Sequence, residues 1–229
     1  SSAEELFFPW VTKPKLALEL NSECEKAGVA VLGTGVNPGF VMDVLPAIIT
    51  QAVHTVDSIR VERVVDASLR RLPLQKKIGL GLDEHTFCSM VEAGKLGPVG
   101  LLESLDFLAS HMGWHLDIRK QDVQPILATK ALKLQMFTIK KGDVAGIRHR
   151  AFGEMNRKTV IELDLRIELN ASRPGDKIMI SGNPPISIWI EGGTPGDPAA
   201  VSSLIRGIPI VLHAKPGIVR RLDRDHFKS

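Results

Sequence analysis

The chain has 229 residues, of which 44% are hydrophobic and 24% charged, so it is long and apolar enough for one large or two small globular domains. Its net charge of +3 and short basic runs argue against a nucleic-acid partner. No apolar stretch reaches the ~18 residues of a membrane span and no signal-peptide pattern is present, so we expect a cytoplasmic protein with no membrane partner. Cys24 and Cys88 show neither zinc-site spacing nor a disulfide pattern.

The first forty residues predict a helix followed by a short buried strand. Thr12 is a plausible N-cap with Pro14 in the first turn, and the helix is expected to end before Gly28. The apolar run 29–32 then reads as a strand of a parallel sheet. One helix and one strand cannot form a stable sheet alone, so this segment requires further strands.

Residues 33–39 form a glycine-rich turn that resembles a nucleotide-binding loop but differs from the dinucleotide fingerprint. After Gly33 and Gly35 the third glycine is displaced by one position and is preceded by Pro38, which lacks an N–H donor. Such a turn binds phosphate poorly, whereas Asn37 has the carbonyl and amide needed to hold a nicotinamide carboxamide or a substrate nitrogen. We expect the nicotinamide end of a dinucleotide site here; the alternative is an ordinary turn residue before proline. A helix is predicted over residues 40–53.

The rest of the chain predicts an α+β lobe with a mainly antiparallel sheet of about four to six strands. Strict alternation of apolar and charged residues over 161–169 indicates a strand with one buried face. The other expected elements are a strand at 58–65, helices at 83–94 (capped by Asp83) and 101–112, a hairpin of 130–140 with 144–152, a hairpin of 177–181 with 186–190, and a closing helix that begins at Asp197-Pro198 and runs to 211.

Several ordered motifs across the chain resemble the 2,4-diaminopentanoate dehydrogenase family, which includes native amine dehydrogenases and is distantly similar to dihydrodipicolinate reductase. The matching segments are residues 31–43, 64–68, 74–79, 97–104, 144–147 and 192–198. The paired-histidine and Ser-Gly-Thr segments of true dihydrodipicolinate reductases are missing. A second departure is Arg206, where a smaller polar residue is expected.

The resemblance implies a two-domain enzyme whose N-terminal Rossmann domain is represented here only by its last part. Residues 1–36 would be the C-terminal part of that domain, residues 37–195 the substrate-binding and dimerisation domain, and residues 196–229 a closing helix and tail that pack back on the Rossmann part. The expected fold class is therefore an α/β remnant of a Rossmann domain plus an α+β lobe. The reaction implied is NAD- or NADP-dependent oxidative deamination of an amine, or reductive amination of a ketone with ammonia, in a homodimer.

The resemblance places a catalytic glutamate at Glu4 or Glu5, because a carboxylate can stabilise a cationic iminium and transfer a proton. The alternative is a solvated acidic pair. Phe40 and Val41 are candidate walls of the substrate pocket, or plain core residues. His149 is a candidate substrate-binding residue on a sheet face, or a structural histidine. No histidine spacing indicates a metal site.

Two further questions stay open at this point. The basic cluster at Arg70, Arg71, Lys76 and Lys77 is interpreted as an exposed or dimer-interface charge set in preference to a carboxylate-binding site, and Trp189 and Phe137 as possible dimer contacts. The functional alternatives to an amine dehydrogenase are an imine reductase related to dihydrodipicolinate reductase and a non-catalytic ligand-binding or oligomerisation lobe.

Overall fold

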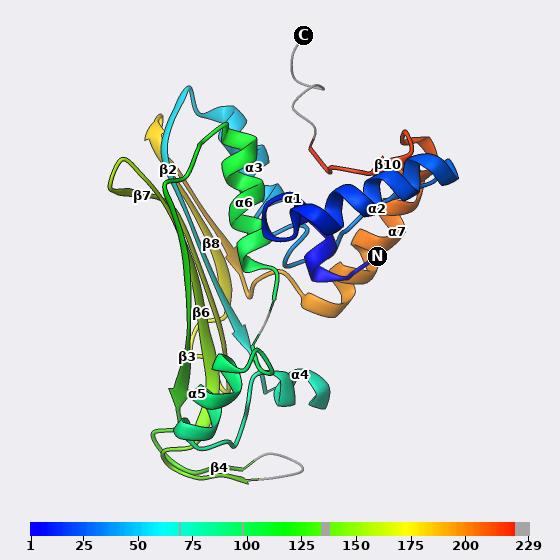
Figure 1. The fold of residues 1–229 in the computed structure, drawn as a ribbon. Helices are drawn as coiled ribbons and strands as arrows, with labels where there is room; N and C mark the ends of the chain where they lie inside the picture. The colour runs from blue at the N-terminus through cyan, green and yellow to red at the C-terminus, as the bar shows by residue number, and fades with distance from the viewer. Residues whose placement is uncertain (69, 98, 134–137, 223–229) are drawn as a thin grey trace.

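The computed structural model describes residues 1–222 except 69, 98 and 134–137. A six-stranded sheet carries helices on one face, and a smaller α/β unit lies beside those helices (Figure 1). We define the α/β unit as residues 1–36 together with 196–222, and the sheet lobe as residues 55–191. Among the described residues, no helix combines the length and the hydropathy needed to cross a bilayer.

The large sheet has the strand order β3-β6-β7-β2-β8-β9, and all neighbours are antiparallel except the pair β2–β7. The prediction of a mainly antiparallel sheet is confirmed, as is the hairpin of β8 and β9. The strands are β2 (Thr55–Asp66), β3 (Ile118–Leu127), β6 (Val144–Met155), β7 (Lys158–Glu168), β8 (Gly175–Asn183) and β9 (Ile186–Glu191).

The predicted hairpin of residues 130–140 with 144–152 is wrong. β6 pairs with β3 and β7, and the short strands β4 (Leu132–Lys133) and β5 (Thr138–Ile139) pair with each other. The backbone groups that follow the turn are already used: Val144 N donates to Leu82 O at 2.8 Å and Val144 O accepts from Gly81 N at 2.9 Å. Tertiary pairing therefore overrides the local turn signal.

Helices cover one face of this sheet, and in Figure 1 no helix of the described residues lies on the other face. The segment that precedes the lobe forms α3 (Val44–Ile49) and the 3₁₀ turn η2 (Thr50–Ala52). The helices of the lobe itself are α4 (Leu72–Lys77), α5 (Glu84–Glu92) and α6 (Leu101–Met112). The predicted cap is confirmed, since the Asp83 carboxylate accepts from Thr86 N at 2.9 Å. The helix predicted from residue 40 begins only at Val44, because Gly39 has φ +124°, outside the helical region.

The α/β unit is a two-stranded parallel sheet between two helices. Strand β1 (Ala30–Val31) pairs with β10 (Gly217–Ile218), α2 (Pro14–Ala27) packs on both strands, and α7 (Gly196–His213) packs on β1. Beyond β1, the backbone of Ser1 donates to Leu32 O at 3.0 Å and accepts from Thr34 N at 2.9 Å. Ser1 therefore lies beside the segment that follows β1 and continues the backbone pairing of this small sheet.

The predicted C-terminal end of α2 is confirmed, whereas the predicted N-caps of α2 and α7 are wrong. Gly28 ends α2 with φ +66°, as predicted. Thr12 is not the cap of α2; it is the last residue of the short helix α1 (Pro9–Thr12), and its hydroxyl donates to Glu103 at 2.9 Å. Asp197 lies in the first turn of α7 and is not its cap, because the helix begins at Gly196.

Candidate active site

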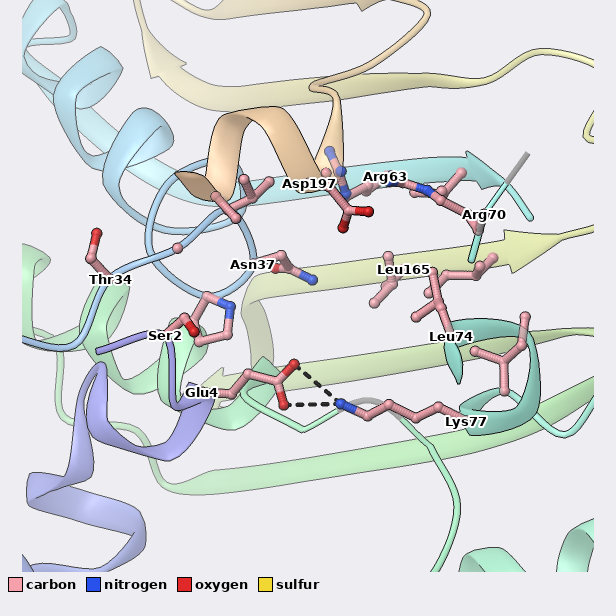
Figure 2. A pocket seen from close by; sticks show the side chains of 18 residues that line it. Ser2, Glu4, Thr34, Asn37, Arg63, Arg70, Leu74, Lys77, Leu165 and Asp197 are labelled. Carbon is pink, nitrogen blue, oxygen red and sulfur yellow. Dashed lines mark hydrogen bonds and ion pairs between the residues drawn. The ribbon is translucent and has the colours of Figure 1, made fainter. Parts of the chain in front are cut away.

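A cavity of about 230 Å³ lies between the α/β unit and the helix-covered face of the sheet (Figure 2). Its apolar floor comes from the sheet, through Val65 on β2 and through Leu165 and Ile167 on β7. Its charged and amide side chains come from five separate segments of the chain and are Glu4, Asn37, Arg63, Arg70, Lys77 and Asp197. A small apolar space with a few polar groups at its edge is the usual form of a small-molecule site.

Glu4 and Glu5 are the first two residues of the short 3₁₀ turn η1 (Glu4–Leu6), and their side chains have different surroundings. The Glu4 side chain lines the cavity, where the Lys77 ammonium donates to its two oxygens at 3.1 and 3.2 Å. Glu5 is outside the cavity lining, and its carboxylate is 3.8 Å from Lys13. Of the two predicted candidates, only Glu4 is therefore placed where it can meet a ligand.

The glycine-rich turn presents Asn37 to the cavity. Gly33 lies so close to Leu6 that a Cβ there would be 2.5 Å from its carbonyl carbon, which accounts for the glycine and fixes the turn beside Glu4. Gly35, Asn37 and Pro38 all line the cavity. Figure 2 shows the Asn37 amide directed into this space. Its Oδ1 is buried and has no hydrogen-bond partner among the described residues, so it is an acceptor that a ligand can satisfy.

A buried carboxylate that the sequence analysis missed holds this turn. Asp43 is fully buried and accepts hydrogen bonds from Gly39 N at 2.9 Å, Val44 N at 2.6 Å and Ser104 Oγ at 2.7 Å. Burial raises the pKa of Asp43 to about 6, an effect that these hydrogen bonds and the positive charge of Arg221 oppose. The sequence signal was a charged residue inside an apolar run, at the position where α3 begins.

Arg221 holds the turn from its other side. Its guanidinium donates to Thr34 Oγ1 at 2.9 Å and to Gly39 O at 3.0 Å. Thr34 itself lines the cavity. The turn that carries Asn37 is thus fixed by α3, by α6 and by the segment after β10.

A buried ion pair positions the start of α7 at the cavity. Arg63 donates from one nitrogen to both oxygens of Asp176 at 2.7 and 2.8 Å, and from the other nitrogen to Thr194 O at 2.8 Å. Asp176 also accepts from Thr194 N at 2.6 Å. Burial lowers the pKa of Arg63, the charge of Asp176 opposes this, and the nearby charge of Arg70 adds to the lowering.

The fold places the residues of the basic cluster in two different environments. Arg71 is exposed and pairs with Asp197 at 2.9 Å, in agreement with an exposed charge, and Lys76 is also exposed. Lys77 pairs with Glu4, and Arg70 lines the cavity. The cluster therefore contributes two cations to the cavity, which the interpretation as an exposed set did not anticipate.

Three predicted substrate-binding residues do not line the cavity. Val41 is completely buried in the main core, and Phe40 packs against that core. His149 lies on β6 opposite Leu165 of β7, is 2% exposed, and its Nε2 is 3.0 Å from Gln121 Oε1. Burial lowers the pKa of His149 to about 4, as expected for a neutral histidine in the core. A direct role of these three residues with substrate stays a prediction.

Residues 40–226 match the model of the 2,4-diaminopentanoate dehydrogenase C-terminal domain. The chain belongs to this family. One relative, 2,4-diaminopentanoate dehydrogenase of Acetoanaerobium sticklandii, is 32% identical over 97% of the chain and 65% of its own length. Another, amine dehydrogenase of Streptomyces virginiae, is 26% identical over 86% of the chain and 61% of its own length.

A solved structure shows the same fold. Amine dehydrogenase from Mycobacterium smegmatis superposes with a TM-score of 0.83 at 22% identity, over 95% of the chain and 65% of that protein. The resemblance to the 2,4-diaminopentanoate dehydrogenase family is confirmed by the family match over residues 40–226 and by the relative that is 32% identical. The chain spans less than two thirds of the length of these relatives, so the family match describes one part of such a protein.

Proposed function

We propose that the chain is the substrate-binding part of an NAD- or NADP-dependent amine dehydrogenase, which deaminates an amine to a ketone or forms the amine from ketone and ammonia. The observation that carries this proposal is the pair formed by the Glu4 carboxylate and the unpartnered Asn37 oxygen at one apolar cavity. The names of two sequence relatives, both dehydrogenases of amines, support it.

The Glu4 carboxylate matches the charge that this reaction develops on nitrogen. The amine binds as an ammonium and the reaction passes through an iminium, and both cations are stabilised by a nearby carboxylate. Glu4 also accepts the proton released when water adds to the iminium carbon in deamination, or when ammonia adds to the ketone carbon in the amination direction, and it returns that proton in the reverse step. The apolar floor of Val65, Leu165 and Ile167 excludes water from the carbon side of the substrate.

Asn37 fits the role of holding a nicotinamide cofactor. Its buried Oδ1 lacks a donor among the described residues, and a carboxamide N–H supplies one. Gly33, Gly35 and Pro38 shape the turn that brings Asn37 to this position. A nicotinamide held at Asn37 would supply the hydride chemistry, which no side chain of the cavity provides.

The α/β unit supports the assignment of residues 1–36 and 196–222 to a larger dinucleotide-binding domain. Its sheet has two described strands of two residues each, and an apolar groove beside β1 is lined by Leu32, Leu204, Ile205 and Ile208. Three or more strands are normally needed for a stable sheet, so further strands would complete this unit. We propose that they belong to a Rossmann domain.

The test uses the full-length protein, and the reduced cofactor is followed by its absorbance. Short ketones are supplied with and without ammonium, and we expect oxidation that depends on ammonium. Glu4→Gln should lower kcat by about 100-fold or more, because general acid–base and electrostatic catalysis each contribute at least this much. Glu5→Gln is the matched control and should stay within about twofold of the parent, since its interaction is a surface ion pair.

The remaining results of this assay decide between the alternatives. Cofactor binding without turnover of any ketone would favour an imine reductase related to dihydrodipicolinate reductase. Failure of the full-length protein to bind either cofactor would favour a non-catalytic lobe. An equal loss in Glu4→Gln and Glu5→Gln would contradict the role that the cavity suggests for Glu4.

We also propose that two copies associate through the face of the sheet that no described helix covers. This face carries ion pairs between neighbouring strands, such as Arg148–Asp164 at 2.6 Å and Arg60–Glu162 at 3.1 Å. The Asp164 side chain is only 6% exposed there. Trp189 lies on the edge strand β9, whereas Phe137 falls outside the described residues. A monomeric mass by light scattering would contradict this proposal.

A further inference from the structure

One arginine side chain holds the turn of Asn37 on both sides of that residue. Nη1 of Arg221 donates one hydrogen bond to Thr34 Oγ1 at 2.9 Å and another to Gly39 O at 3.0 Å. Thr34 precedes Asn37 in the chain, and Gly39 follows it. A single guanidinium nitrogen therefore joins the two sides of the turn whose middle lines the cavity.

The backbone of Gly39 leaves the turn little freedom. Its N–H donates to the Asp43 carboxylate at 2.9 Å, so both of its backbone polar groups are bound. The turn is also folded back on itself, because a Cβ on Gly39 would collide with the nitrogen of Gly35. A shift of Gly39 is therefore passed to Gly35 and to Asn37, which lies between them.

Arg221 reaches the turn from the segment that follows β10 in the α/β unit. The backbone of this segment is paired, since Val219 N donates to Val31 O at 2.8 Å. The Arg220 guanidinium carbon lies 4.9 Å from the centre of the Trp10 ring. Arg221 itself lies outside the cavity lining. It therefore acts on a ligand in the cavity through the turn that it holds.

The charge of Arg221 faces the buried carboxylate of Asp43 across Gly39. Burial lowers the pKa of Arg221, and the negative charge of Asp43 opposes this change. In return, the positive charge of Arg221 opposes the rise that burial causes in the pKa of Asp43. The titration of Asp43 therefore reports whether the Arg221 guanidinium is in place.

We propose that Arg221 is a positioning residue for the cofactor site, which holds the turn so that the Asn37 amide faces the cavity before a nicotinamide binds. This inference rests on the proposed function, because the carboxamide is assigned there to Asn37. The buried Asn37 Oδ1 has no partner among the described residues, and a hydrogen bond to it needs good alignment. A turn that is held in advance has no ordering cost on binding, so the affinity for cofactor depends on Arg221.

The test measures how tightly the full-length protein binds reduced cofactor when neither amine nor ketone is present. NADH and NADPH are titrated separately, and binding is followed by the fluorescence of the nicotinamide. Arg221→Gln should raise the Kd of the preferred cofactor by about 10- to 100-fold, the usual effect of losing hydrogen bonds from a charged donor. The KM of the amine at saturating cofactor should stay within about twofold of the parent, since Arg221 lies outside the cavity lining.

Arg220→Gln is the matched control, because it removes one positive charge from the adjacent position. Arg220 is exposed and stacks on Trp10, and the pairing of Val219 fixes the segment without it. The Kd of the cofactor should therefore stay within about threefold of the parent. An equal loss in Arg220→Gln and Arg221→Gln would overturn the proposal, since it would reflect net charge alone. Unchanged cofactor affinity in Arg221→Gln would also overturn it.

Thr34→Val removes one acceptor of Arg221 without changing the charge. It should weaken cofactor binding by about threefold or more, which tests the proposal even where Arg221→Gln does not fold. Because Thr34 also lines the cavity, a double-mutant cycle separates its contact with Arg221 from any contact with the ligand. The double variant should bind cofactor within about twofold of Arg221→Gln. Fully additive losses would overturn the proposal.

A titration of Asp43 without cofactor gives a second readout that does not depend on activity. Carboxyl-carbon NMR of the full-length protein, with the signal assigned by Asp43→Asn, should give a midpoint of about pH 6 in the parent. The midpoint should rise in Arg221→Gln, because the positive charge that opposes the raised pKa of Asp43 is removed. Arg220→Gln should leave it unchanged. An equal midpoint in Arg221→Gln and the parent would overturn the proposal.

These measurements separate this inference from the proposed function. If the Kd and the Asp43 midpoint change as expected but no amine is turned over, the role of Arg221 stands and the proposed function fails. If amines are turned over and cofactor affinity is equal in Arg221→Gln and the parent, the proposed function stands and the role of Arg221 fails. If the full-length protein binds neither cofactor, both fail.

Discussion

The sheet lobe and the α/β unit differ in how completely each buries its apolar side chains. In the lobe, residues such as Ile161, Leu163 and Ile178 are fully buried between the sheet and its helices. In the α/β unit, Leu18, Ile205 and Leu212 are 64%, 61% and 75% exposed. The contrast also holds for charge, because the lobe contains the buried pair Arg63–Asp176, whereas the pairs on α2 are at the surface.

The reason for this difference is the number of strands in each region. Six paired strands with helices on one face enclose a core, while two strands of two residues cannot cover two helices. The cavity lies between the two regions and takes Glu4 and the start of α7 from the α/β unit, and Asn37 from the turn that follows it. The sheet lobe therefore forms the floor of the cavity, and the α/β unit, whose surface is more apolar, lies on its other side.

The largest effect is expected when the buried ion pair Arg63–Asp176 of the lobe is broken. Asp176→Asn should lower the free energy of unfolding by about 3–5 kcal/mol, because Arg63 would stay buried without a counter-charge. Urea unfolding measures this value. The matched control is Glu23→Gln in the exposed pair Lys26–Glu23 of α2, with an expected change of less than about 1 kcal/mol. Similar losses in both variants would remove the distinction between the two regions.

Asp43 makes the stability of the Asn37 turn depend on pH. Its pKa is about 6 in the folded protein against 3.8 as the ordinary value, so the unfolded chain loses this proton first as pH rises. The stabilisation is complete below about pH 4 and is lost through pH 6, a difference of about 3 kcal/mol. Relative to Asp43→Asn, the parent should therefore lose stability between pH 4 and neutral pH. Unfolding curves that keep a constant difference across this range would contradict the assignment.

Burial of His149 in the lobe should make the stability depend on pH in the direction opposite to that of Asp43. Its folded pKa is about 4 against 6.5, so it favours the folded state above pH 6.5, and this stabilisation is lost as pH falls toward 4. The shift corresponds to about 3 kcal/mol at most, and less where the lobe relaxes on protonation. His149→Gln should make unfolding less dependent on pH in this range. An unchanged pH dependence would show that His149 is not held neutral by burial.

The smallest effect is expected on the exposed face of α7. Ile205→Ser should change the free energy of unfolding by less than about 0.5 kcal/mol, because this side chain is already in contact with solvent. The measurement is made on this 229-residue chain. A loss above about 2 kcal/mol would mean that the face is buried in solution by a second copy, and the two regions would then not differ in how completely they bury their apolar side chains.

The sequence predicted the elements that depend on neighbouring residues, and it failed where residues far apart in the chain interact. The alternation over 161–169 identified β7, Asp83 identified the start of α5, and Gly28 identified the end of α2, since each pattern acts within a few residues. The hairpin around residue 142 failed because distant backbone groups at Gly81 and Leu82 pair with Val144. The helix expected from Phe40 begins late because Gly39 and the cap at Asp43 set its start.

The sequence by itself determined the family, the mainly antiparallel sheet, and Asn37 and a glutamate as candidate ligands. These depend on motifs and periodicity that the order of residues contains. Only the tertiary structure decided that Glu4 and not Glu5 lines the cavity, and that Lys77 pairs with it. Those side chains are separated by up to seventy-three residues along the chain, and their contacts depend on how the α/β unit packs on the sheet lobe.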